Sequence, residues 1–225
     1  MAEEKDSSIH DRFFKEILSD INLAKEWLEF FLPMEIKSLI ELNTLTFNKD
    51  SFITDSLREV LSDMVFRCKF RKNGKHEPMF ISLILEHKSR LGRIPHAQLL
   101  NYLAGAYHIQ SKQKGRLQPV IPIVFYHGKK RAHIKMGMQS YFANMPGDTV
   151  KYIPLFEFLL IDMSEFPDEK LWSIGNAFLR SAMITMKYFK DPKWYWIILF
   201  QFTILFFRLK TGTYIIDLQF IFSEF

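Results

Sequence analysis

Two charged residues closely follow an almost wholly apolar run of the sequence. In LEHKS, residues 85–89, Glu86 and Lys88 are two positions apart and follow MFISLIL, residues 79–85. Because side chains alternate along a strand, a strand continuing through this segment would carry both groups on one face. A carboxylate and an ammonium group at the end of a buried strand could bind a cation and hold a water. Taken alone, the pair also fits an ordinary surface ion pair where a core strand emerges.

A second carboxylate, Asp63, precedes another strand-like run, MVFRCKF, residues 64–70. The dipeptide Asn73-Gly74 between the two runs is typical of a β-hairpin turn. Asp63 lies 10 residues before Asn73 and Glu86 lies 12 after Gly74, so a hairpin with a small slip of register would bring the two carboxylates together.

Two converging carboxylates beside a lysine are suited to a hard cation. Mg²⁺ takes oxygen ligands at about 2.0–2.1 Å and keeps waters for substrate phosphates. The residues therefore predict a divalent-cation site with ligands Asp63 and Glu86, in which Lys88 holds the attacking water. Such a site is suited to hydrolysis of a phosphodiester bond.

The charge of the chain is unevenly distributed. Residues 1–63 hold 7 Lys and Arg against 14 Asp and Glu, residues 64–135 hold 15 against 2, and residues 136–225 hold 8 against 9, which gives the net +5. A basic middle third indicates a polyanionic partner such as nucleic acid, although a solvated face without a partner stays open. The candidate phosphate contacts are Arg67, Lys69, Arg71, Lys72, Arg90 and Arg93.

Composition indicates a folded protein with one large domain. Hydrophobic residues make up 48% and charged residues 24% of 225, which excludes wholesale disorder and low-complexity architecture. The single cysteine cannot form an internal disulfide, and the start MAEEKDSSIHDRFF is too polar for a signal peptide, so we expect a cytoplasmic protein. The histidines lack the spacing of zinc ligands and are expected at the surface or in loops.

Hydrophobic periodicity and turn residues predict an α/β fold with a mixed sheet, in the order helix, three strands in hairpins, helix, strand. Pro122 cannot donate to a ladder, so its strand is expected to have a bulge or a free edge there. Residues 129–151 are expected to form a loop. The predicted elements are a helix over 10–32 broken near Ser19-Asp20 and stopped by Pro33, a short helical piece over 34–42, strands over 44–53, 61–70 and 79–85, a helix over 95–111 starting at Pro95, strands over 119–128 and 155–161, and a helix over 168–186.

Several blocks of the sequence, in order, resemble the recombination-promoting nuclease, or putative transposase, family of the PD-(D/E)XK nuclease superfamily. The resemblance covers roughly residues 9–187. The blocks that carry it are DRFFKEILSD (11–20), SFITDSLREVLSDMVFRCKF (51–70), ISLILEHKSR (81–90), HAQLLNYLAGAY (96–107), PVIPIVFYHGK (119–129) and FLLIDMSEFPDEKL (158–171).

The resemblance implies a restriction-endonuclease-like αβββαβ core and Mg²⁺- or other divalent-metal-dependent cleavage of DNA in bacterial recombination or mobile-element activity. It implies that Asp63 and Glu86 are the metal ligands and Lys88 is the signature lysine. Gln98 matches the helix residue often found beside the site. Many relatives carry Gln in place of this lysine, so Lys88 agrees with the wider superfamily and does not by itself ensure activity.

The end of the chain departs from the family. From Trp194 it reads WYWIILFQFTILFFRLKTGTYIIDLQFIFSEF, where family members are usually polar and helical. We therefore divide the chain into a nuclease-like domain, residues 9–187, and an atypical hydrophobic tail, residues 188–225. The uncharged, mainly apolar segment 194–207 has 14 residues and falls short of the ~20 that span a bilayer, so a buried or interfacial segment is favoured over a membrane span.

Two functions follow from these residues. The first is an Mg²⁺-dependent DNA endonuclease that uses Asp63, Glu86 and Lys88. The second is a catalytically inactive DNA-binding relative with a truncated or frame-shifted C-terminus. Binding of the basic block to anionic lipid is a weaker third alternative, and a homodimer stays open because enzymes that cut two strands are often dimers.

Overall fold

The computed structural model describes residues 13–47, 64–72, 75–86, 95–112, 116–128, 130–134, 137–142 and 146–188. The chain divides into two compact units. One unit comprises Met1–Phe30 together with Met163–Phe225, and the other comprises Phe31–Asp162. The first unit is helical in its described part, and the second contains the sheet.

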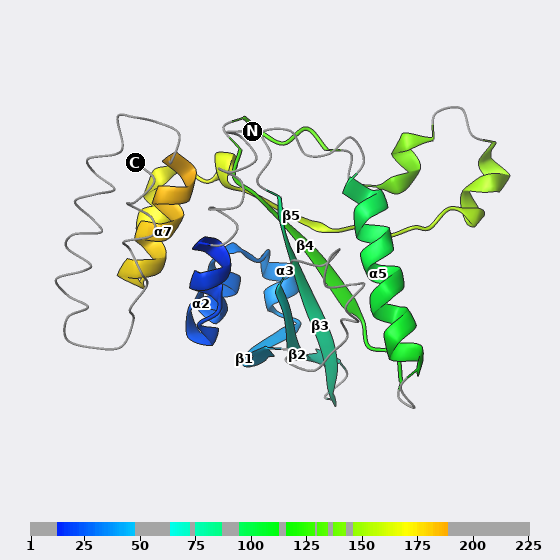
Figure 1. Ribbon diagram of the computed structural model, residues 1–225, viewed down its shortest axis with the longest axis horizontal. Helices are drawn as coiled ribbons and strands as arrows, with labels where there is room; N and C mark the ends of the chain where they lie inside the picture. The colour runs from blue at the N-terminus through cyan, green and yellow to red at the C-terminus, as the bar shows by residue number, and fades with distance from the viewer. Residues whose placement is uncertain are drawn as a thin grey trace. The chain divides into compact units, whose positions relative to one another are not determined.

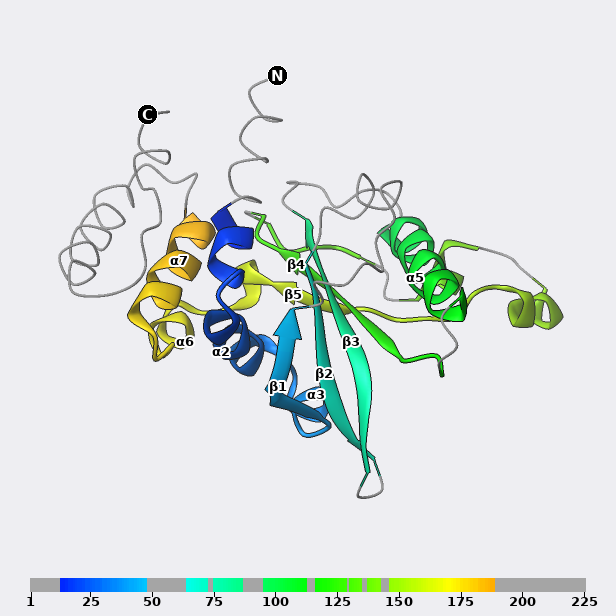
Figure 2. The same cartoon turned by 60° about the horizontal axis from the view of Figure 1, so that its bottom comes forward.

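The sheet has five strands in the order β1-β2-β3-β4-β5 (Figures 1 and 2). The pairs β1–β2 and β2–β3 are antiparallel, whereas the pairs β3–β4 and β4–β5 are parallel. Together with its helices this arrangement confirms the predicted α/β class and mixed sheet. The strands are β1 (Ile40–Phe47), β2 (Met64–Lys72), β3 (Lys75–Glu86), β4 (Val120–Tyr126) and β5 (Leu159–Asp162).

The central hairpin forms as the sequence predicts. β2 and β3 pair without interruption from Met64 opposite Leu83 to Lys72 opposite Lys75, the two residues that flank positions 73 and 74. Along β2, Phe66 and Cys68 are buried whereas Arg67 and Lys69 are exposed. This alternation fixes the register, because a slip of one residue would bury the charges.

Helix α5 (Pro95–Lys112) covers one face of the sheet. It begins at Pro95, as predicted, where the missing N–H costs no intrahelical bond. Leu99 of α5 packs with Val124 of β4 and Phe158, while Tyr102 and Leu103 pack on Val120. The connection β3-α5-β4 is thus a helical crossover between parallel strands, and it defines what we call the α5 face.

The opposite face of the sheet is also apolar in its described part. Phe66, Cys68, Ile123 and Phe125 are buried on it. The ring of Phe31 meets that of Phe125 edge to face, with centroids 6.2 Å apart. Burial, with the carboxylate of Glu41 as a smaller cause, raises the pKa of the Cys68 thiol to about 12.

The structure shifts the start of two predicted strands and decides between the two alternatives expected for Pro122. The last predicted strand, β5, begins at Leu159 and not at residue 155. β1 starts at Ile40 and not at residue 44, because the helical piece α3 (Met34–Lys37) ends earlier than expected. β4 has no bulge at Pro122, since its pairing with β3 runs unbroken from Val120 to Tyr126. Its pairing with β5 starts only at Ile123, so Pro122 has a free edge on the β5 side of the described ladder.

The helical unit contains residues 13–18 in helical conformation, α2 (Ile21–Phe31), α6 (Asp168–Trp172) and α7 (Ala177–Tyr188). The predicted break at Ser19-Asp20 is confirmed. The Asp20 carboxylate accepts hydrogen bonds from the N–H groups of Asn22 and Leu23, at 2.7 and 3.3 Å, and caps α2.

The predicted single helix over 168–186 is wrong, because the chain breaks between Trp172 and Ala177. Asn176 caps α7 by accepting from the N–H groups of Phe178 and Leu179, and its own N–H donates to Glu26 Oε1 at 2.6 Å. That contact fixes the break from outside the segment.

Between residues 130 and 151, the residues that the structure describes form two short 3₁₀ helices, η1 (Met138–Tyr141) and η2 (Gly147–Tyr152), and otherwise follow the expected loop. A third 3₁₀ helix, η3 (Met163–Glu165), follows β5. The expectation for the histidines is wrong for His96. Its ring is fully buried against the rings of Tyr141, Phe156 and Phe158. Among the helices of the described residues, none combines the length and apolar character needed to cross a bilayer. The apolar segment 194–207 lies outside those residues.

Candidate active site

The carboxyl ends of the three parallel strands meet in one register row. Glu86, the last residue of β3, is the Cα partner of Tyr126, the last residue of β4. Tyr126 is in turn the partner of Asp162, the last residue of β5. Because helix α5 starts where β3 has ended, its first turn also belongs to this end of the sheet (Figure 1). Polar residues thus end each of the three parallel strands.

Tyr126 and Asp162 lie on the α5 face, since Val124 and Leu160, two residues before each of them, pack against Leu99 of α5. Both side chains are buried, with 2% of each exposed. The Asp162 carboxylate accepts a hydrogen bond of 2.7 Å from the N–H of Ala132 and so holds the segment that follows β4. Burial and the nearby Asp162 charge raise the pKa of Tyr126, which keeps the phenol protonated.

Gly128 lies directly against the ring of Tyr126. A Cβ at position 128 would fall 2.0 Å from the Tyr126 hydroxyl oxygen and 2.2 Å from Cζ. Only a residue without a side chain therefore leaves room for this position of the phenol. The end of β4 and the two residues after it, YHG, thus contain the buried Tyr126 and a glycine, Gly128, that packs against its ring.

Several predicted site residues are not described by the structure. Asp63 and Lys88 lie outside the described residues, and so do Arg90 and Arg93; for Glu86 and Lys72 only the backbone is described. Gln98 lies on an exposed part of α5, one residue before the buried Leu99. Within the described ranges no group of three or more His, Cys, Asp or Glu side chains could hold a metal ion.

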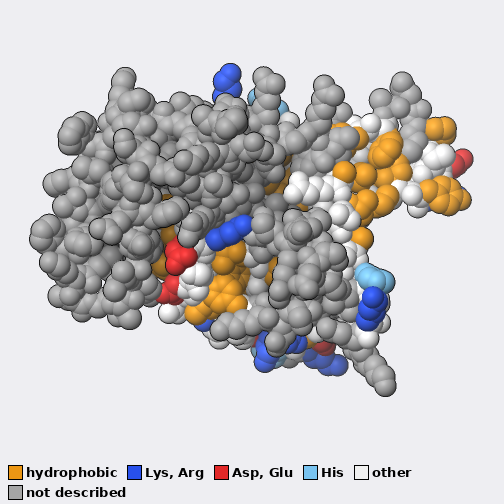
Figure 3. Space-filling model, viewed as in Figure 1, with side chains coloured by type: hydrophobic (Ala, Val, Ile, Leu, Met, Phe, Trp, Pro, Cys, Tyr) orange, Lys and Arg blue, Asp and Glu red, His pale blue; other side chains and the backbone are white. Residues whose placement is uncertain are grey.

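The described basic candidates form one stripe on β2. Arg67, Lys69 and Arg71 alternate with buried residues and are exposed. Val65, on the same side of the strand, packs against the cluster of Tyr102, Leu103 and Val120, so the stripe belongs to the α5 face. In Figure 3, Lys and Arg side chains gather along the lower margin, over β1 and β2, with carboxylates among them.

One carboxylate, Glu41 of β1, lies within the basic stripe. Its Oε1 is 3.5 Å from Nε of Arg71 and also pairs with Nδ1 of His76. Its side chain is 13% exposed, whereas that of Arg71 is 66% exposed. The guanidinium of Arg71 is therefore shared between Glu41 and solvent.

Sequence reasoning missed Tyr126, Gly128 and Asp162. The signal that identified Glu86, a polar residue ending an apolar run, is also present in PVIPIVFYHG and FLLID. The sequence does not predict the register of the parallel strands, and that register is what aligns the three strand ends.

Comparison with known proteins places these features in a family. The model of the family described as "Putative transposase, YhgA-like" matches residues 8–204. No solved structure matches the chain.

Three curated relatives come from Escherichia coli (strain K12). The recombination-promoting nuclease RpnA is 29% identical over 174 residues, which cover 76% of this chain and 57% of that protein. RpnC, of the same description, is 26% identical over 72% of this chain and 53% of its own length. The inactive recombination-promoting nuclease-like protein RpnE is 28% identical over 76% and 56%.

This chain therefore spans little more than half the length of these relatives. The family model, in contrast, covers most of the chain. On that match, the chain belongs to the YhgA-like putative transposase family.

Proposed function

We propose that this chain is a divalent-metal-dependent DNA endonuclease that hydrolyses phosphodiester bonds in recombination or mobile-element activity. In this proposal its sheet and α5 form a restriction-endonuclease-like core of the PD-(D/E)XK type. Asp63 and Glu86 are the metal ligands, Lys88 holds the attacking water, and Gln98 assists from the first turns of α5.

The register of the β2–β3 hairpin is the observation that carries the proposal. Met64, which follows Asp63 in the sequence, pairs with Leu83, three residues before Glu86. The two segments that contain the proposed carboxylates therefore enter and leave the hairpin at the same end of the sheet. The printed names of RpnA and RpnC support the reaction class.

The chemistry of the donor set fits a hard cation, because both proposed ligands are carboxylates and carboxylate oxygen is what Mg²⁺ prefers. A bound divalent cation would supply an activated water and stabilise the charge that develops on the phosphate. Lys88, two residues beyond Glu86, is the group we expect to orient that water. Its positive charge would also offset the negative charge that the phosphate brings to the site.

The DNA backbone is expected to lie along the α5 face. Arg67, Lys69 and Arg71 are exposed there at alternate positions of β2. Alternate residues of a strand are about 6.6 Å apart, close to the spacing of phosphates along a DNA strand. The remaining proposed contacts are Lys72, Arg90 and Arg93.

A plasmid-nicking assay tests the proposal. We expect the purified chain to nick supercoiled plasmid with Mg²⁺ and to lose this activity in EDTA. Asp63→Ala and Glu86→Ala are expected to lower the rate at least a hundredfold. Asp148→Ala, which changes an exposed carboxylate of η2, is the matched control and should nick at the wild-type rate. Equal nicking by Asp63→Ala and the control would reject the assignment.

A second function, DNA binding without cleavage, is favoured by the similarity to RpnE, whose printed name calls it inactive. It predicts salt-sensitive binding to duplex DNA and no nicking with any divalent cation. Because charged contacts release counterions, the affinity should fall steeply between 50 and 200 mM salt. Wild-type nicking that requires a metal would exclude this alternative.

A further inference from the structure

The segment between β4 and β5 carries large side chains that are exposed. Its described residues are 130–134, 137–142 and 146–158, and we call them the arm. Tyr152 is 78% exposed, Leu155 62% and Phe142 45%. Figures 1 and 2 show the two 3₁₀ helices of the arm beyond α5, on the side away from the strands, and in Figure 3 hydrophobic side chains gather over this part of the molecule, at the upper right. Large side chains that gather on one exposed segment indicate a contact surface.

The root of the arm is held at the carboxyl ends of the parallel strands. Ala132 donates its N–H to the carboxylate of Asp162, the last residue of β5, at 2.7 Å. The rings of Tyr141 and Phe156 pack against His96, in the first turn of α5, with centroid distances of 5.1 and 5.7 Å. The arm therefore starts from the end of the sheet at which the proposed nuclease site lies.

The charges of the arm favour an anionic partner. Its exposed basic side chains, Lys130, Arg131 and Lys151, are opposed by Asp148 and Glu157 in the described part of the arm. The ammonium of Lys151 lies 5.3 Å from the ring centroid of Tyr152. Burying this ammonium against an apolar partner would cost free energy, whereas an anion beside the ring would pair with it.

A nucleic-acid strand supplies both groups that this pair can bind. Proteins hold single strands by stacking bases on aromatic rings and by neutralising the backbone with basic side chains. A base in a duplex is already stacked on its neighbours, so an exposed ring can stack on a base only where that base is unpaired or at an end.

We propose that the arm is a contact surface for single-stranded DNA, in which the ring of Tyr152 stacks on an unpaired base and the ammonium of Lys151 binds a phosphate of the same strand. This inference rests on the proposed function, because it takes DNA as the substrate. The substrate class is then DNA with unpaired bases beside the segment that is cleaved.

The arm offers matched variants for this test. Tyr152→Ala removes the ring, whereas Tyr152→Phe keeps the ring and removes only the hydroxyl. Leu155→Ala removes an exposed apolar side chain of the same arm and reports on contacts that need only apolar area. Because these positions are exposed, each variant should melt close to the wild-type temperature.

Fluorescence anisotropy with a labelled oligothymidylate of about 15 nucleotides, on the full chain in EDTA, measures the contact without cleavage. Tyr152→Ala is expected to weaken the affinity about tenfold, whereas Tyr152→Phe and Leu155→Ala should bind as the wild type does. Lys151→Ala should weaken binding severalfold and lower the slope of log affinity against log salt by about 0.7, the value for one phosphate contact on a single strand. On a fully abasic strand of the same length, Tyr152→Ala and wild type should bind equally.

The outcomes separate this role from the proposed function. If the wild type does not bind the oligothymidylate, or if Tyr152→Ala binds it equally well, the role of the arm is overturned, and plasmid nicking with Mg²⁺ still decides the proposed function. If Leu155→Ala loses as much affinity as Tyr152→Ala, the arm binds through apolar area, as a protein partner would require, and base stacking is overturned. If the variants behave as expected and the wild type nicks plasmid with no divalent cation, the role of the arm stands and cleavage is rejected.

Discussion

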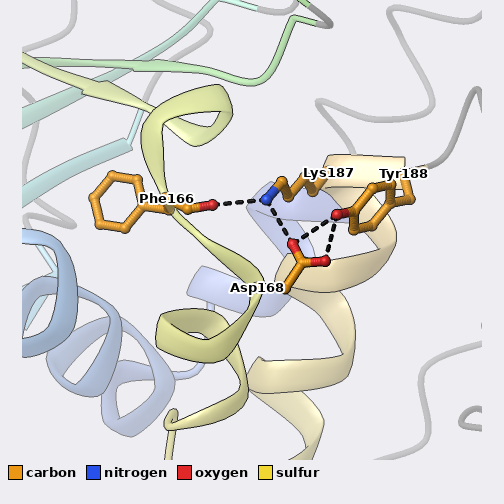
Figure 4. A network of polar contacts seen from close by, with 4 residues as sticks. All are labelled: Phe166, Asp168, Lys187 and Tyr188. Carbon is orange, nitrogen blue, oxygen red and sulfur yellow. Dashed lines mark hydrogen bonds and ion pairs between the residues drawn. The ribbon is translucent and has the colours of Figure 1, made fainter.

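Two carboxylates at the ends of short elements, the half-buried Asp168 of α6 and the buried Asp162 of β5, have very different surroundings. Asp168 accepts hydrogen bonds of 2.6 Å from Nζ of Lys187 and from the hydroxyl of Tyr188, and Lys187 also donates to the carbonyl of Phe166 (Figure 4). Asp162 accepts from the backbone N–H of Ala132 and stands in a register row with Tyr126.

The difference separates a structural network from a candidate functional one. At Asp168, Lys187 balances the charge of the carboxylate, and the hydroxyl of Tyr188 donates to the same carboxylate. Few hydrogen-bonding groups of this network therefore remain for a ligand. At the strand end, Asp162 instead accepts a hydrogen bond from a backbone N–H, that of Ala132. Strand ends of parallel sheets are where α/β proteins bind ligands, because side chains from several strands converge there.

The largest expected effect comes from breaking the Asp168 network. Asp168→Ala should lower the free energy of unfolding by about 3 kcal/mol, because it leaves Lys187 and Tyr188 without their acceptor in a partly buried site. Urea unfolding followed by circular dichroism measures the change. Asp148→Ala, at an exposed carboxylate, should stay within about 0.5 kcal/mol of wild type. Mn²⁺ affinity should not change in the folded Asp168 variant, and a tenfold loss would remove the distinction drawn between the two regions.

The same network predicts how stability depends on pH. Burial by itself would raise the pKa of Asp168, but the hydrogen bonds from Lys187 and Tyr188 and the charge of Lys187 outweigh it, so the pKa lies below its ordinary value. A depressed pKa in the folded state means that the stabilisation is present above the unfolded pKa of about 3.9 and is lost as pH falls through the folded value. The stability difference between wild type and Asp168→Asn should therefore be constant from pH 7 to 5 and shrink below pH 4. A difference that persists at pH 2 would contradict the cause given for the shift.

A pair of tyrosines sharpens the comparison at a smaller scale. Tyr188→Phe should cost about 1.5 kcal/mol of unfolding free energy, because it removes a hydrogen bond to a charged group, and should leave Mn²⁺ binding unchanged. Tyr107→Phe, which removes the hydroxyl that accepts from the N–H of Val120, should cost less, because that bond joins two neutral groups, and should also leave Mn²⁺ binding unchanged. Thermal melting and calorimetry on the two variants, in one buffer, provide the four values. Equal losses of stability in both variants would mean that the charged acceptor does not set the difference.

The parts of the fold that the sequence predicted are those set by neighbouring residues. Asp20 caps the next helix through its own side chain, Pro95 starts α5, and β2 pairs with β3 as far as Lys72 opposite Lys75, on either side of positions 73 and 74. Each of these depends on contacts within a few residues or across one tight turn. The proposed ligand pair of Asp63 and Glu86 was inferred from the same hairpin, and it stays a prediction.

The parts that the sequence did not predict depend on residues far apart in the chain. The break between α6 and α7 is held by Glu26, which accepts from the N–H of Asn176 across 150 positions. The row of Glu86, Tyr126 and Asp162 depends on the register of parallel strands, which no single turn sets because a helix or long loop separates them. His96 was misassigned for a similar reason, since its burial comes from Tyr141, Phe156 and Phe158.

The smallest expected effect concerns Glu41, whose carboxylate faces a basic stripe and not an internal network. Glu41→Gln keeps the shape of the side chain and removes the charge that Arg71 and His76 now share. If the stripe binds DNA, the freed guanidinium of Arg71 should raise duplex affinity severalfold at low salt and steepen the salt dependence by about one phosphate contact. Fluorescence anisotropy across salt concentrations measures both quantities.

The same variant reports on the buried side of the sheet. Because the Glu41 charge contributes to the raised pKa of Cys68, its removal should lower that pKa slightly while burial keeps it high. Thiol alkylation should therefore remain slow in the folded variant and become fast only in denaturant. An affinity gain without any change in salt slope would mean that Glu41 repels DNA at a distance and does not compete for Arg71. The measured slope thus decides whether this carboxylate occupies a phosphate-binding group or merely lowers the positive charge of the stripe.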